Sequence, residues 1–150
     1  MIANVRYVAA ATALALFWTV GFASGAGGHK GGNAVLTPVS EIRWADVPGF
    51  PGVQMAVVRG DAGKGAHYQM LKFTGGFSAP LHHHTADHYG TVVAGTLVLG
   101  SGGRDVKLPP GSYFSFTGKM AHTTRCEAGA DCILAIDARS KWDVVPEKAK

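Results

Sequence analysis

Turn-forming residues interrupt most of this chain at intervals of about eight to twelve residues, and this spacing limits the fold more than any other feature. Twenty-one glycines and seven prolines agree with many tight turns. No segment outside the N-terminal apolar stretch shows a sustained helical period. We therefore predict an all-β sandwich or barrel with seven or more strands. The expected strands span 53–59, 66–73, 82–94, 96–99, 112–117, 121–126 and 133–139.

The first 26 residues have the order of a secretory signal, with the basic Arg6, an uncharged apolar run and then small residues. The apolar run, Val8–Ala23, has 16 residues, which is short of the roughly 18 to 20 that span a bilayer, so an uncleaved anchor is the less favoured alternative. We expect cleavage after Ala23 or Ala26, a periplasmic or secreted protein, and no stable membrane insertion of the mature chain. The predicted organisation is a signal peptide (1–26), a glycine-rich linker (27–34), one folded domain (35–146) and a loose tail (147–150).

The charge pattern argues against a nucleic-acid partner. The formal net charge is +4 and the pI is 9.2, but lysine and arginine are scattered, with neither a basic block nor interleaved aromatic residues. A small-molecule substrate or ligand is the expected partner.

Two cysteines, Cys126 and Cys132, flank the turn sequence EAGAD between two expected strands. In an exported protein, such a pair favours a disulfide across a hairpin turn. The alternative is two free thiols whose side chains diverge.

Four histidines carry most of the functional information. His82 and His84 project to one face of a strand because alternate side chains share a face, and His88 keeps the same parity. A return strand that carries His122 could complete a set of ligands around one metal ion. Imidazole is a common metal ligand, and few other roles require so many on one face.

The spacing around these histidines resembles that of the cupin superfamily. The first cupin motif, G-x5-H-x-H-x3,4-E-x6-G, is matched from Gly76 to Gly95, with His88 in place of the glutamate. The second motif, G-x5-P-x-G-x2-H-x3-N, is matched less well. Gly111 and His122 are present, but Thr117, Lys119 and Cys126 replace the proline, the second glycine and the asparagine.

The resemblance covers roughly residues 50–140 and implies a single-domain cupin jelly roll. It also implies one divalent transition metal (Mn, Zn, Cu, Fe or Ni) bound by His82, His84, His88 and His122 with open positions, and it makes a homodimer possible. Replacement of glutamate by His88 makes all four ligands neutral, so the ion keeps its full double charge. Bound water should then be more acidic and anionic substrates more strongly attracted.

Several neighbouring residues are weaker candidates. By strand parity, His83 should face away from the site. His67 reads as an ordinary half-buried residue. Asp87 competes with His88 for the glutamate position, or could hydrogen-bond a ligand imidazole. Tyr89 is a weak candidate for a proton donor. The apolar and aromatic residues expected near the mouth are Met70, Phe77, Tyr113, Phe116 and Met120.

Three classes of function fit this pattern. An oxidoreductase of dioxygenase type, acting on a small, partly apolar organic substrate, is favoured because neither motif supplies a glutamate as a general base. A metal-dependent isomerase or lyase is the catalytic alternative. A module that binds a metal and a small ligand without turnover, as a sensor or carrier, is the other. The sequence determines neither the substrate nor the metal.

Overall fold

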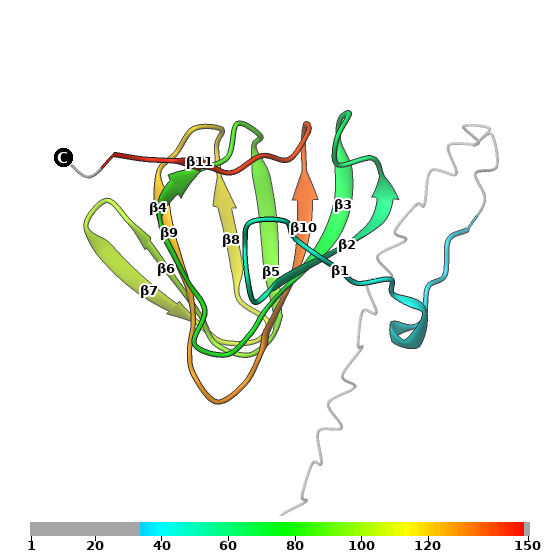
Figure 1. The fold of residues 1–150 in the computed structure, drawn as a ribbon, viewed down its shortest axis with the longest axis horizontal. Coiled ribbons are helices and arrows are strands. Elements are labelled where there is room, and N and C mark those ends of the chain that lie inside the picture. The colour runs from blue at the N-terminus through cyan, green and yellow to red at the C-terminus, as the bar shows by residue number, and fades with distance from the viewer. Residues whose placement is uncertain (1–33, 149–150) are drawn as a thin grey trace, which may run out of the picture. The chain divides into compact units, whose positions relative to one another are not determined.

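The computed structural model describes residues 34–148, and the predicted signal peptide and almost all of the linker lie outside this range. Two antiparallel sheets face each other in this part of the chain (Figure 1). One sheet has the order β1-β2-β3-β10-β5-β8 and the other β11-β4-β9-β6-β7. The strands are β1 (Ala45–Asp46), β2 (Val53–Gly60), β3 (His67–Phe73), β4 (Ser78–His83), β5 (His88–Ala94), β6 (Leu97–Ser101), β7 (Arg104–Leu108), β8 (Tyr113–Phe116), β9 (His122–Cys126), β10 (Cys132–Ala138) and β11 (Val145–Pro146).

The predicted all-β jelly roll is confirmed. The only helical element in the described range is a short 3-10 helix, η1 (Val39–Glu41), and no helix there has the length and hydrophobicity that crossing a bilayer requires. The core lies between the sheets because each inner strand turns alternate apolar side chains inward. Its fully buried members include Val92, Leu97, Leu134 and Ile136.

The predicted continuous strand 82–94 is wrong. It is two strands in different sheets, β4 and β5, separated by a bend at Thr85 and Ala86. Hydrogen bonds to distant residues hold this bend. The Thr85 amide donates to Asp143 Oδ1 at 2.7 Å, and Asp87 Oδ1 accepts from the Gly118 amide at 2.6 Å. A local pattern of alternating residues carries no information about such partners.

The sequence prediction also missed the edge strand β7. Ser101 and Arg104 are paired at the ends of β6 and β7, and the two residues that join them, Gly102 and Gly103, have φ of 59° and 79°. Two central residues with positive φ are typical of a type I′ hairpin turn, which glycine adopts without strain. The strand itself is mostly exposed and charged, so it lacks the apolar alternation by which the other strands were predicted.

A disulfide joins Cys126 to Cys132, as predicted, but not across a hairpin. β9 and β10 do not pair with each other and belong to opposite sheets. The bond therefore links the two sheets where the chain crosses between them (Figure 1).

We expect the double replacement Cys126→Ser and Cys132→Ser to lower the free energy of unfolding by about 2 kcal/mol, because a short closed loop is released in the unfolded chain. Urea denaturation with and without reductant measures the effect. Reductant should destabilise the wild type but not the variant. Equal midpoints for the wild type under both conditions would contradict the expectation.

Candidate metal centre

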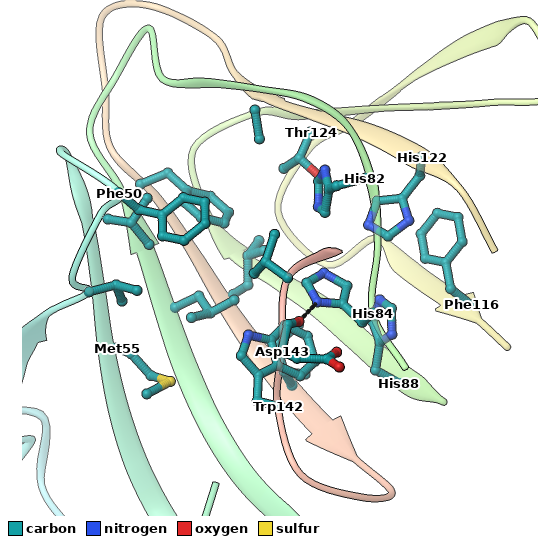
Figure 2. A pocket seen from close by; sticks show the side chains of 18 of the residues that line it. Phe50, Met55, His82, His84, His88, Phe116, His122, Thr124, Trp142 and Asp143 are labelled. Carbon is teal, nitrogen blue, oxygen red and sulfur yellow. Dashed lines mark hydrogen bonds between the residues drawn. The ribbon is translucent and has the colours of Figure 1, made fainter. Parts of the chain in front are cut away.

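The jelly roll brings the four predicted histidines together at one end of the interior. His82 lies near the end of β4, opposite its cross-strand partner His122 in β9. His88 is the first residue of β5, directly after the bend. All four are buried. Figure 2 shows their rings grouped around one space, with the ring centroids of His82 and His122 4.5 Å apart and those of His84 and His88 4.8 Å apart.

Three of the four histidines already have the spacing of a metal site. The candidate ligand atoms of His82, His84 and His122 all lie within 4.8 Å of one another. His88 lies beside this group but slightly farther away, with its ring centroid 5.7 Å from that of His122. The structure therefore brings three candidate ligands together and places the fourth beside them.

Backbone carbonyl groups fix which ring nitrogen carries the proton. His82, His88 and His122 each donate from Nδ1 to the carbonyl of the residue two positions earlier, at 2.7, 3.2 and 2.9 Å respectively. His84 Nδ1 donates to the Asp143 carbonyl at 2.5 Å. A carbonyl oxygen can only accept, so each Nδ1 must be protonated and each Nε2 keeps its lone pair. Metal-binding histidines are typically held in this way.

Burial keeps these imidazoles neutral. Desolvation lowers the pKa of His84 to about 3 and that of His122 to about 4, and it also lowers the pKa of His82 and His88. The hydrogen bonds to the carbonyl groups oppose this shift, but they are the smaller effect. Neutral imidazoles with free Nε2 atoms suit a divalent first-row transition metal, so the residues fit the cofactor that the sequence predicts.

Aromatic rings flank the histidines on two sides. Phe116 stacks on His122 with centroids 4.2 Å apart, and Trp142 stacks on His84 at 4.0 Å. Trp142 also meets His88 edge-on at 5.3 Å. The sequence reasoning missed Trp142, because it lies outside both motifs and no spacing links it to the histidines.

A C-terminal segment, residues 140–147, ties the site together, and we call it the strap. β11 within it pairs with β4 at His82 and His83. The Asp143 carbonyl holds His84, while its carboxylate accepts from the Thr85 amide at 2.7 Å and from the Thr85 hydroxyl at 2.6 Å. Burial alone would raise the pKa of Asp143, but the hydrogen bonds from Thr85 outweigh it and lower the pKa. Asp143 is the second residue that the sequence reasoning missed.

One departure from the second cupin motif, Lys119, can be explained by the structure. Lys119, which replaces the glycine, has φ of 66°, in the left-handed region that favours glycine. Its amide donates to the His84 carbonyl at 2.8 Å, which fixes the backbone of a ligand residue. This position therefore has a backbone conformation that suits the motif glycine, although it carries a lysine side chain.

The weaker candidates lie away from the four rings. His83 points to the other face, as predicted, and its Nδ1 lies 2.7 Å from a Glu147 carboxylate oxygen. Asp87 binds the Gly118 amide and no imidazole. Tyr89 lies outside the cavity with Arg139 above its ring at 5.1 Å, which argues against it as a proton donor.

The prediction for His67 needs correction, because this residue is fully buried, with only 3 % of its surface exposed. Its Nδ1 donates to the Gly65 carbonyl at 2.8 Å, and its Nε2 lies 3.1 Å from the Gln69 side chain. Among the residues expected at the mouth, Phe77 and Phe116 line the cavity, whereas Met70, Tyr113 and Met120 do not.

A cavity of about 380 Å³ extends from the histidines into the barrel interior. Apolar side chains form most of its wall. Beyond the four histidines, its lining includes Thr124, Asp143 and no lysine or arginine.

Comparison with known proteins agrees with this architecture. The family model described as "Cupin domain" matches residues 70–137. No curated protein matches the sequence significantly.

Solved structures similar to this chain include the polyketide cyclase RemF from Streptomyces resistomycificus, with 16% identity and a TM-score of 0.65, covering 79% of this chain and 88% of that one. An RmlC-like cupin protein from Ralstonia eutropha has 21% identity and a TM-score of 0.63, covering 79% and 76%. KdgF from Halomonas sp. has 22% identity and a TM-score of 0.59, covering 71% and 94%. At these identities the likeness establishes the fold alone.

His84→Ala and His122→Ala should each lower the metal content per protein chain by at least tenfold, because each variant lacks one ligand nitrogen. Elemental analysis of the purified variants measures this. His83→Ala is the matched control, since His83 faces away, and it should keep wild-type metal content. Loss of the metal in the control alone would contradict the assignment.

The stability of the metal-free protein should depend on pH between about 6.5 and 3. The unfolded chain takes up protons on these histidines first, because their pKa values are lowered on folding from 6.5. The stability is therefore fully present above pH 6.5 and is lost as the pH falls, by about 1.4 kcal/mol for each unit of pKa shift. Urea denaturation at several pH values should show this slope, and His122→Asn should reduce it. A flat profile would contradict the neutral, desolvated state.

Proposed function

We propose that this chain, which belongs to the cupin superfamily, is an exported oxidoreductase of dioxygenase type that acts on a small organic substrate. In this proposal one divalent transition metal (Mn, Zn, Cu, Fe or Ni) is held by His82, His84, His88 and His122. Mn, Cu, Fe and Ni are the ions that suit the oxidative reaction, and zinc suits only a redox-inert site.

One observation carries the proposal: neutral imidazoles with free Nε2 atoms border an apolar cavity. Cupins commonly bind a divalent metal, and such an ion would supply a Lewis-acid and redox centre for oxidation of an organic compound by dioxygen. The histidines hold the metal without neutralising its charge, which favours a substrate that binds as an anion. The apolar walls exclude water and hold the organic part of the substrate.

The second candidate is a metal-dependent isomerase or lyase, and Asp143 favours it. Asp143 borders the cavity and is kept ionised by Thr85, so it could accept a proton from a bound substrate. Both its oxygens already accept hydrogen bonds, however, and its backbone carbonyl positions His84. These contacts support a positioning role for Asp143 and leave the oxidative reaction as our proposal.

Two features support export. The N-terminal 26 residues have the composition of a signal peptide, and the folded domain contains a disulfide. Disulfides persist mainly in oxidising compartments such as the bacterial periplasm.

Oxygen consumption tests the proposed reaction. Protein loaded separately with Mn, Fe, Cu or Ni should consume oxygen with at least one member of a panel of catechols, flavonols and β-diketones. His84→Ala should abolish the uptake and His83→Ala should preserve it. Absence of uptake with every metal and compound would contradict the proposal.

Asp143→Asn separates the two candidates, because asparagine can still accept from Thr85 but cannot act as a base. If Asp143 is a general base, the variant should lose about 10²- to 10⁴-fold in turnover while keeping its metal. For the dioxygenase we expect oxygen uptake within a few-fold of the wild type.

A further inference from the structure

We propose that the substrate has an apolar body that fills the barrel interior, one oxygen-bearing end that binds the metal, and no second anionic group. This inference rests on the proposed function for the metal and goes beyond it by defining the substrate class. The features that carry it are the composition of the cavity wall and the position of its polar groups.

The cavity has a polar end and an apolar end. In Figure 2 the four histidines lie on one side, and Phe50 and Met55 lie on the other. The loop before β2 borders the apolar end, and two hydrogen bonds shape this loop. The Phe50 amide donates to the Val47 carbonyl at 3.0 Å, and the Phe50 carbonyl accepts from the Val53 amide at 3.1 Å. Further apolar side chains complete this wall: Leu71, Phe73, Phe77, Leu97, Leu99, Phe114, Leu134 and Ile136.

The wall offers no cationic partner for a second negative charge. No lysine or arginine lines the cavity. The Asp143 carboxylate has the wrong sign for an anionic group and is bound by Thr85. A phosphate or carboxylate on the body of the substrate would therefore lose its water without gaining an ion pair, at a large cost in binding free energy. Sugar phosphates and dicarboxylates do not fit such a wall.

The size of the cavity narrows the class further. Small-molecule sites usually measure about 300–1,000 Å³, and this one, at about 380 Å³, lies at the lower end. The fitting compounds are single-ring or two-ring molecules, or short branched chains, with adjacent oxygens at one end. Because the metal ligands are neutral, an enol, phenol or catechol that binds as its anion suits the polar end.

Binding of catechols to zinc-loaded protein tests the inference without any reaction, because zinc does not undergo redox chemistry. Titration calorimetry would compare catechol with 4-methylcatechol, 4-ethylcatechol and 3,4-dihydroxybenzoate, and zinc content would be checked after each titration. All four share the same metal-binding end. Each added CH₂ should tighten binding by about fourfold. The carboxylate should weaken binding at least tenfold relative to 4-methylcatechol.

A variant of the apolar end makes the test specific. Phe50→Ala should reduce the advantage of 4-ethylcatechol over catechol by several-fold, because it removes part of the wall that the alkyl group would contact. Tyr113→Ala is the matched control, because Tyr113 is an exposed aromatic residue outside the cavity, and it should change neither affinity.

The outcomes separate this inference from the proposed reaction. Three results would each overturn the substrate class, whatever the oxygen uptake. These are binding of 3,4-dihydroxybenzoate as tight as or tighter than that of 4-methylcatechol, no increase in affinity from the alkyl groups, and no binding of any catechol. A clear preference for the alkylcatechols by a protein that consumes no oxygen with any metal would support the substrate class and refute the dioxygenase.

Discussion

The site depends on the hydrogen bonds that four imidazole Nδ1 atoms donate to backbone carbonyl groups. These bonds fix the tautomer and orient each ring, so that every Nε2 has a free lone pair in the same buried space. In three cases the acceptor lies two residues earlier in the chain. Pro80 belongs to β4 itself, whereas Ala86 and Met120 lie in the turns that lead into β5 and β9, so local backbone orients each of these rings. His84 is the exception, because its acceptor is Asp143 in the strap.

The strap connects the candidate metal centre to distant parts of the fold. Trp142 donates from its amide to the Ala62 carbonyl while its ring stacks on His84, and Asp143 joins His84 to the bend at Thr85. The orientation of one ligand thus depends on a segment almost 60 residues later in the chain. Since the strap pairs through only two residues of β11, opening of the strap and loss of metal should be coupled.

Local patterns predicted much of this structure, and long-range contacts account for what they missed. Alternation of apolar residues predicted the β-strands and the outward direction of His83. The glycine spacings around the histidines predicted the jelly roll and the grouping of the four histidines. They could not show the bend at Thr85, because its partners are Asp143 and Gly118. The same limit hid Trp142, and a charged edge strand such as β7 has no apolar pattern to detect. His67 was misjudged because its burial depends on the packing of the whole sheet.

The central claim is that imidazole nitrogens of this cluster bind a transition metal. X-ray absorption spectroscopy of the purified full chain, at the edge of whichever metal copurifies, tests it most directly. The account predicts a first shell of nitrogen and oxygen at about 2.0–2.2 Å, with the outer scattering of at least three and up to four imidazole rings. A first shell of sulfur, or one of oxygen alone without imidazole scattering, would contradict it.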